Sequence, residues 1–203
     1  MQNKDFEHRG RLREKDSTGE RLMDYKQVFE KLITAFDREG IRYALIGGFA
    51  LGLWGAARAT VDIDFLVHRD DMPHVDAMME KLGYECRHKS GNVTQYISPV
   101  AIYGSVDFLH AFRELSIAML KKAETKKIFN GLLFIRVLRP DDIIALKLQA
   151  IKNDPARMEA DIADIKMLLS VQKDEIDYAL LEEYGRALGM ELLVQQLVKE
   201  SAA

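Results

Sequence analysis

The sequence predicts a mixed α/β domain followed by a wholly helical C-terminal part. Two observations support this: strand-like alternation and helical periodicity interleave up to about residue 138, whereas only helical spacing follows Pro140. The chain has 203 residues, of which 48% are apolar, enough for one core with an appendage or for two small cores. We therefore expect a small mixed β-sheet flanked by helices over residues 21–138, and a helical subdomain over 139–203.

The first 20 residues differ in character from the rest. They carry many charges and almost no apolar side chain, and a Ser17-Thr18-Gly19 breaker interrupts them. Such a stretch cannot bury enough apolar surface to fix its conformation, so we expect a disordered tail over residues 1–20. Because the tail has no apolar core, no secretory signal is expected there.

The first structured elements are predicted from Tyr25 onward. A helix is indicated up to Gly40, because apolar residues recur at helical spacing: Val28, Phe29, Leu32, Ile33 and Phe36. A short strand is predicted over Ile41–Ile46, a turn at Gly47-Gly48 and a short helix over Phe49–Trp54. This order places a pair of glycines where a strand ends and a helix begins.

The clearest strand is Val61–Val67. Its odd residues are expected to face the core, whereas Asp62, Asp64 and Leu66 share the opposite face. A second alternating strand, Tyr103–Leu109, is expected to turn Val106 and Phe108 inward and Asp107 outward. Both strands therefore carry carboxylates on a face that is not the core.

The remaining elements follow from turn signals and periodicity. They are a helix over Asp70–Leu82, paired strands over Tyr84–Arg87 and Val93–Ile97, a hairpin over Lys127–Val137 that turns at Asn130-Gly131, and helices over Asp141–Lys152, Ala156–Leu169 and either side of Gly185–Gly189.

Composition and charge exclude several classes of protein. Because 29 Lys and Arg oppose 32 Asp and Glu, the formal net charge is −3 and no global attraction to nucleic acid or anionic membrane is expected. The longest uncharged stretch, Tyr43–Ala57, is shorter than the roughly 17 to 25 residues of a spanning helix, so no membrane partner is expected. Cys86 is the only cysteine, which excludes an internal disulfide and favours a reducing cytoplasm.

The acids of the two strands suggest a cation site. Residues two apart on a strand share a face, so Asp62 and Asp64 can converge on one point. If the strand with Asp107 is the neighbour, a third carboxylate reaches the same point. Like charges about 4 Å apart repel by roughly 4 kcal/mol at an effective dielectric near 20, and Mg²⁺ is the natural counter-ion for such oxygens. The alternative is that these acids lie on a solvated sheet face.

The segment before the acids suggests an anion. Glycine at positions 47 and 48 allows a sharp bend that presents backbone N–H groups to a phosphate. Arg58 and Thr60 lead into the acidic strand, where a guanidinium could neutralise phosphate or pair with the acids. Neither of the two common glycine-rich phosphate motifs occurs, so a Rossmann site and a P-loop are not supported.

These residues together resemble a known family. Gly47-Gly48, Arg58-x-Thr60-x-Asp62-Ile63-Asp64 and a separate strand with Asp107 resemble the nucleotidyltransferase fold related to DNA polymerase beta. Within that fold, the run from Arg139 to Lys147, followed by Arg157 and Asp161, is similar to the AbiEii-like toxins and their small bacterial relatives. The resemblance implies that Asp62 and Asp64 bind the metal, that Asp107 is the third acid and that Lys147 and Asp161 complete the site.

The two helical residues are also unusual by pattern. Lys147 projects from a predominantly apolar helix face, where an unpaired ammonium is costly, and Asp161 lies on the apolar side of the next helix. A structural ion pair between them is one explanation and a role in catalysis is the other. Asp164 is a candidate of second rank.

We therefore expect a metal-dependent nucleotidyltransferase that moves a nucleoside monophosphate from an NTP to an acceptor hydroxyl or phosphate. Asp62 and Asp64 would hold Mg²⁺ or Mn²⁺, and Asp107 would bind a second metal or deprotonate the acceptor. Gly47, Gly48, Arg58, Thr60 and Lys147 would contact the nucleotide. By resemblance, the acceptor is a tRNA end and the protein is the toxin of a toxin–antitoxin pair, with an antitoxin as partner. The alternatives are transfer to a small molecule, as in aminoglycoside nucleotidyltransferases, and a non-catalytic nucleotide-binding module.

Overall fold

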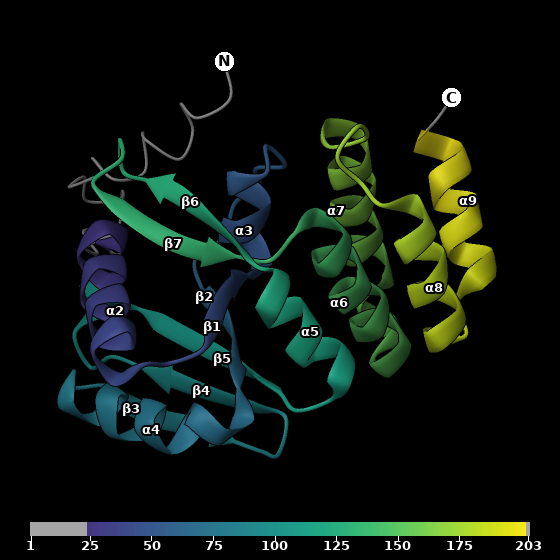
Figure 1. Ribbon diagram of the computed structural model, residues 1–203. Helices are drawn as coiled ribbons and strands as arrows, with labels where there is room; N and C mark the ends of the chain where they lie inside the picture. Colours follow the sequence, from purple (N-terminus) through teal and green to yellow (C-terminus); the bar gives the residue numbers. More distant parts are fainter. Residues whose placement is uncertain (1–23, 202–203) are drawn as a thin grey trace. The chain divides into compact units, whose positions relative to one another are not determined.

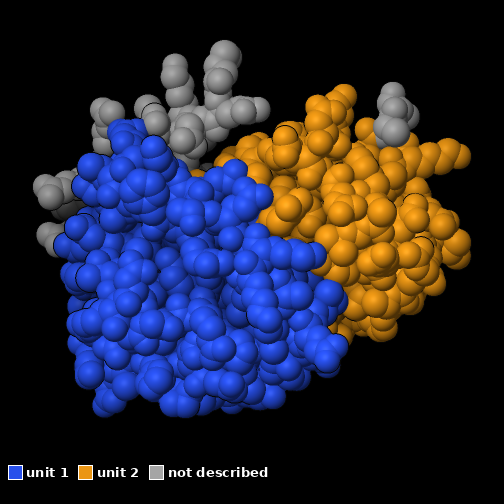
Figure 2. All heavy atoms as spheres, in the orientation of Figure 1, with its two compact units in different colours: residues 1–50, 59–138 blue, residues 51–58, 139–203 orange. Residues whose placement is uncertain are grey.

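The computed structural model describes residues 24–201, and the tail expected over residues 1–20 lies outside this range (Figure 1). The described chain forms two compact units, drawn in blue and orange in Figure 2. The first contains residues 24–50 together with Ala59–Leu138. The second contains Leu51–Arg58 and the chain from Arg139. The short segment 51–58 thus groups with residues that follow it by more than 80 positions.

A seven-stranded mixed sheet forms the centre of the first unit, as the sequence predicts for the fold class (Figure 1). Its spatial order is β3-β4-β5-β2-β1-β7-β6, in which β2 pairs with β5 and β1 with β7 in parallel and all other neighbours are antiparallel. The strands are β1 (Tyr43–Ile46), β2 (Ile63–His68), β3 (Glu85–Lys89), β4 (Val93–Ile97), β5 (Ser105–Ala111), β6 (Glu124–Ile128) and β7 (Leu133–Val137).

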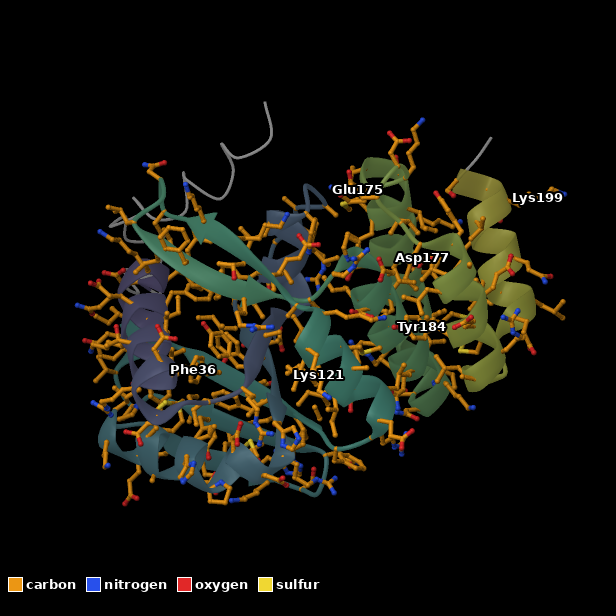
Figure 3. All side chains as sticks on the ribbon, viewed as in Figure 1. Phe36, Lys121, Glu175, Asp177, Tyr184 and Lys199 are labelled. Atoms are coloured by element: carbon orange, nitrogen blue, oxygen red, sulfur yellow. The ribbon has the colours of Figure 1, made fainter. Side chains whose placement is uncertain are left out.

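Helices cover this sheet, and an aromatic cluster forms its core. The helical elements are α2 (Tyr25–Glu39), α3 (Gly47–Leu53), η1 (Arg69–Asp71), α4 (Met72–Lys81), η2 (Ala101–Tyr103) and α5 (Glu114–Lys122). Phe36 of α2, labelled in Figure 3, packs edge-on against Phe65 of β2, with ring centroids 5.1 Å apart. Phe65 stacks on Phe108 of β5 at 5.8 Å, and all three rings are fully buried. The odd residues of β2 therefore face the core, and the acids face away from it.

Four helices form most of the second unit: α6 (Pro140–Asn153), α7 (Met158–Val171), α8 (Tyr178–Leu188) and α9 (Glu191–Ser201), with η3 (Pro155–Arg157) between the first two. Helix α6 packs on α7 and α8, and α9 packs on α7 and α8. Tyr184, labelled in Figure 3, donates a hydrogen bond of 2.6 Å to the buried carboxylate of Asp142 at the start of α6.

The structure corrects three predictions for individual elements. Val61 does not face the core: it precedes β2 and is 70% exposed. Gly185 does not end a helix but lies inside α8, where a Cβ atom would come within 3.0 Å of Val194 of α9; the glycine permits this close helix contact. The turn predicted at Gly47-Gly48 is instead part of a helix, because α3 begins at Gly47 itself.

Helix α5 is an element that the sequence reading leaves out. Five of its nine residues are apolar, but only Met119 and Leu120 are buried, and basic residues end it. The helix packs against β2 and β5, and Leu66 of β2 is fully buried on the face that carries the acids. That face is thus partly covered and not a wholly solvated surface.

Among residues 24–201, no helix is both long and apolar enough to cross a membrane.

Candidate functional site

The acids of the first unit lie on neighbouring strands. Because β5 is the parallel neighbour of β2, Asp107 lies directly opposite Asp64 in the sheet register. Asp62 comes immediately before β2, and its Oδ1 accepts a hydrogen bond from the Ser105 hydroxyl at the start of β5. The structure therefore brings Asp62, Asp64 and Asp107 to one end of the same two strands.

Asp107 is held on its other side by β4. Gln95 is its register partner there, and the Gln95 Nε2 donates a hydrogen bond of 2.8 Å to Asp107 Oδ2. Burial raises the pKa of Asp107 above its usual range, and the negative charge of Asp62 raises it further, although the Gln95 bond acts in the opposite direction. These acids therefore share a local excess of negative charge.

The two glycines make room for side chains that the sequence singles out. A Cβ atom at Gly47 would come within 2.0 Å of Asp64 Oδ2, and one at Gly48 within 2.6 Å of the Thr60 Cβ. Gly47 also has a φ of +65°, in the left-handed region that favours glycine. The backbone thus passes against Asp64 and Thr60 at a distance that a larger residue would not permit.

We expect Gly47→Ala to displace Asp64 in addition to straining the backbone. The positive φ alone costs about 1 to 2 kcal/mol of stability, whatever the surroundings. Gly40→Ala is the matched control, because Gly40 has a φ of +66° and nothing within 4 Å of an added Cβ atom. Chemical denaturation of both variants measures the excess due to the Asp64 contact. Equal losses of stability in the two variants would contradict this contact.

Asp62, Asp64 and Asp107 are the candidate ligands for a divalent cation. Within residues 24–201, no group of three or more His, Cys, Asp or Glu is placed so that it could hold a metal ion as the side chains stand. Mg²⁺ seldom needs such a cage, since it is usually bound by one or two carboxylates together with substrate phosphates and water. Asp64 and its register partner Asp107 supply such oxygens. Asp62 is a third carboxylate nearby, and its negative charge raises the pKa of Asp107. The donor set fits Mg²⁺ or Mn²⁺.

The other expected residues form a charged network within the second unit. Lys147 Nζ donates to Asp161 Oδ1 at 2.8 Å and to Asp164 Oδ2 at 2.6 Å. The lysine side chain is 9% exposed and the two carboxylates 3% and 4%. The expected ion pair of Lys147 with Asp161 is present, and Asp164, which by pattern is less clearly inward, is also buried and pairs with the same lysine.

Two arginines extend this network to the surface. Arg157 Nε donates to Asp161 Oδ2 at 3.0 Å, and Arg58 Nε donates to both oxygens of Asp164 at 2.9 and 3.0 Å. Their side chains are 55% and 43% exposed. The sequence analysis offered phosphate or the acids of the following strand as partners of Arg58. Arg58 does pair with an acid, but this acid is Asp164 of α7.

The sequence analysis did not single out three neighbours of these residues, Ser105, Gln95 and Arg157, although strand alternation and helical spacing could have indicated them. Ser105 and Gln95 lie on the acid face because side chains alternate along a strand, and this alternation follows once β4 and β5 are known to pair. Arg157 precedes Asp161 by four residues, the spacing at which helical side chains meet.

A separate cavity of about 380 Å³ lies in the first unit near the opposite ends of β1 and β2. Its lining combines apolar and basic side chains: Ile41, Arg42, Tyr43, His68, Ile117, Leu120, Lys121 and Arg136. None of the acids described above lines it.

Solved structures that are similar in fold to this chain include nucleotidyltransferases. The antibiotic-resistance factor ANT(2'')-Ia, in complex with adenylyl-2''-tobramycin, has a TM-score of 0.60 and 16% identity, covering 80% of this chain and 98% of that one. A nucleotidyltransferase-like antigen of Paracoccidioides brasiliensis has a TM-score of 0.51 and 18% identity, covering 88% and 94%. The lincosamide adenylyltransferase LnuA with lincomycin has a TM-score of 0.50 and 16% identity, covering 74% and 99%. At these identities, the likeness concerns the fold.

No curated protein sequence matches the chain. The sequence model of one family, described as uncharacterised nucleotidyltransferase, matches residues 13–199 and thus nearly the whole chain, including every acid discussed above. Together with the mixed sheet and the acids on β2 and β5, this match shows that the chain belongs to this nucleotidyltransferase family.

Proposed function

We propose that this protein transfers a nucleoside monophosphate from an NTP to an acceptor, in a reaction that depends on Mg²⁺ or Mn²⁺. The observation that carries the proposal is the juxtaposition of Asp64 and Asp107 on neighbouring strands, with Asp62 at the same end. All three acids are present, which argues against a module of the same fold that has lost its catalytic residues.

Each residue has a proposed role. Asp62 and Asp64 hold the cation, which when bound neutralises and orients the triphosphate. Asp107 either takes part in holding a cation or accepts the proton of the acceptor hydroxyl. The acceptor oxygen attacks the α-phosphorus as the bond to the leaving pyrophosphate breaks.

The phosphate contacts are proposed as well. Gly47, Gly48 and Thr60 would approach the outer phosphates. By the resemblance alone, Arg58 and Lys147 are candidates for neutralising phosphate charge, with Asp161 orienting Lys147.

Two acceptors are proposed, in order. The first is a tRNA end, with the protein acting in the cytoplasm as a toxin that an antitoxin controls; its support is the resemblance of the Lys147 and Asp161 segment to AbiEii-like toxins. The second is the hydroxyl of a small molecule. It is favoured by the likeness in fold to ANT(2'')-Ia with adenylyl-2''-tobramycin and to LnuA with lincomycin.

One labelling experiment separates these acceptors. The protein is incubated with each α-labelled NTP, Mg²⁺ and either total tRNA, tobramycin or lincomycin. Labelled tRNA supports the first proposal, and a labelled antibiotic supports the second. Release of pyrophosphate with none of these acceptors labelled would contradict both proposals for the acceptor.

Metal and nucleotide together are expected to raise the thermal midpoint of unfolding. A ligand that binds only the native state adds about 2.7 kcal/mol at 100 times its Kd, or roughly 5 to 10 °C for a chain of this size. Differential scanning fluorimetry with millimolar Mg²⁺ or Mn²⁺ and each NTP measures the shift. An Asp62→Asn, Asp64→Asn double variant is the control and is expected to lose it. An unchanged wild-type midpoint would count against the metal site.

A further inference from the structure

The cavity of about 380 Å³ in the first unit lies on the sheet face that carries the acids. Ala44 of β1 pairs with Leu66 of β2 on that face. Because Leu45 pairs with Val137 across the parallel strands β1 and β7, Arg136 is the neighbour of Ala44 on the same face. Arg136 also lines the cavity. The sheet therefore forms one wall of the cavity.

Helix α5 forms the other wall. It packs against β2 and β5, and its residues Ile117, Leu120 and Lys121 line the cavity. These three residues are three and four positions apart, so they lie on one side of the helix. Leu120 is buried, whereas Lys121, labelled in Figure 3, is exposed. The wall thus combines an apolar interior with a lysine that solvent reaches.

The cavity is separate from the acids. His68 of β2 lines it, and Asp64 precedes His68 by four residues, or roughly 13 Å along a strand at 3.3 Å per residue. Leu66 lies between them on the same face and is fully buried. The cavity therefore shares no residue with the cation and phosphate contacts proposed above.

Two of the four basic side chains that line the cavity have acidic partners. Arg42 donates hydrogen bonds of 2.9 and 2.7 Å to the carboxylate of Asp71, and His68 Nδ1 lies 3.7 Å from a carboxylate oxygen of the exposed Asp70. Among residues 24–201, no Asp or Glu lines the cavity itself. Because Asp71 neutralises Arg42 and Asp70 adjoins His68, these two basic groups add little net charge.

The other two basic side chains, Lys121 and Arg136, form no ion pair within the described part of the chain. One Nη of Arg136 donates to the carbonyls of Leu120 and Ala123 at the end of α5, at 2.8 and 3.2 Å. These carbonyls offset only part of a full charge. The Arg136 Nε is buried and has no hydrogen-bond acceptor in residues 24–201, which is unfavourable. The cavity thus has two positive charges without counter-ions and an N–H that lacks an acceptor.

We propose that this cavity binds a small phosphate monoester with an apolar body, at a site distinct from that of nucleotidyl transfer. A phosphate monoester carries a charge of about −1.5 to −2 at pH 7 and three acceptor oxygens. It therefore matches Lys121, the charge of Arg136 and the unpaired Nε. Ile41, Ile117 and Leu120 supply the apolar surface for the rest of the molecule. Sites for small molecules occupy about 300 to 1,000 Å³, so a cavity of about 380 Å³ suits a compact one.

Three probes test the chemistry of the site. Phenyl phosphate combines the dianion with an apolar ring, inorganic phosphate supplies only the anion, and benzoate has the ring with a single negative charge. Calorimetric titration of the wild-type protein in EDTA measures each affinity. We expect phenyl phosphate to bind at least about tenfold more tightly than the other two, because only phenyl phosphate uses both the apolar wall and both charges. No binding of phenyl phosphate, or an equal affinity for either of the other probes, would overturn the proposal.

Lys121→Met tests whether the probe binds in the cavity, with Lys122→Met as its matched control. Lys122 is the next residue of α5, is also exposed and does not line the cavity. Loss of one hydrogen bond to a charged group corresponds to about a tenfold loss in affinity or more. We expect this loss for phenyl phosphate in Lys121→Met, with an unchanged thermal midpoint, and wild-type affinity in Lys122→Met. Equal affinity of the two variants would overturn the proposal.

The acid variants keep this inference separate from the transfer reaction. A phosphate that bound at the acids would require Mg²⁺ and would lose affinity in the Asp62→Asn, Asp64→Asn double variant. We expect phenyl phosphate to bind the wild type and this double variant equally in EDTA. Binding that appears only with Mg²⁺, or that the double variant loses, would overturn the inference and leave the proposed function intact. Absence of transfer in the wild type, with phenyl phosphate binding dependent on Lys121, would overturn the proposed function alone.

Discussion

Asp64→Asn is expected to lower nucleotidyl transfer by about 10³-fold and to leave the fold intact. A bound cation stabilises transition-state charge by several kcal/mol, and each 1.36 kcal/mol corresponds to a factor of ten in rate. Asparagine retains the shape of the side chain but removes one of the charges that face each other across β2 and β5. Less repulsion leaves stability unchanged or slightly raised. Initial rates of pyrophosphate release and thermal unfolding of the apo protein measure the two effects.

The same result is expected for Asp62→Asn, because the asparagine oxygen still accepts the hydrogen bond from Ser105. Asp37→Asn, an exposed position near the end of α2, is the control and should retain wild-type activity. If the two site variants retained activity and were destabilised in the apo protein, Asp62 and Asp64 would be structural acids.

Strand alternation was enough to predict which face of β2 carries the acids. The pattern of Asp62, Asp64 and the buried Ile63 and Phe65 fixes their sides, because side chains alternate whatever the neighbouring strands are. From the sequence, Asp107 could be placed beside Asp62 and Asp64 only if its strand paired with theirs, because no local pattern shows which strands pair. The structure meets the condition by making β5 the neighbour of β2.

Several features depend on contacts between distant residues and could not be read from local pattern. The reason for glycine at position 47 is the Asp64 side chain, 17 residues later, and not only the bend of the chain. Arg58 pairs with Asp164, 106 residues later, so the alternatives of phosphate and nearby acids did not include its actual partner.

Asp164 shows why a single-partner reading of a buried charge is incomplete. The spacing of Asp161 and Asp164 puts both on one side of α7, but the apolar pattern of the helix marks Asp161 as inward more clearly than Asp164. Burial explains the second acid. An ammonium that is withdrawn from water has three donors to satisfy, and two carboxylates satisfy more of them than one.

Lys147→Met is expected to destabilise the protein by about 3 to 5 kcal/mol, the largest effect on stability among these variants. It leaves Asp161 and Asp164 buried and paired with the half-exposed Arg157 and Arg58. For a chain of this size, the loss corresponds to a midpoint lowered by roughly 6 to 20 °C. Thermal unfolding followed by circular dichroism measures it. Lys166→Met is the control, because Lys166 forms an exposed pair with Glu200, and its midpoint should shift little.

The double variant Lys147→Met, Asp161→Leu separates a structural role from a catalytic one. It removes Asp161 together with the lysine and leaves Asp164 with Arg58, so most of the lost stability should return. If Lys147 stabilises phosphate charge during transfer, the refolded site still loses about 2.7 to 4 kcal/mol of transition-state stabilisation, or a hundredfold to a thousandfold in rate. We expect this loss, with kcat lowered more than the KM for NTP is raised. A folded double variant with near wild-type kcat would show that Lys147 and Asp161 only stabilise the helical unit, and that Asp62, Asp64 and Asp107 carry the chemistry without them.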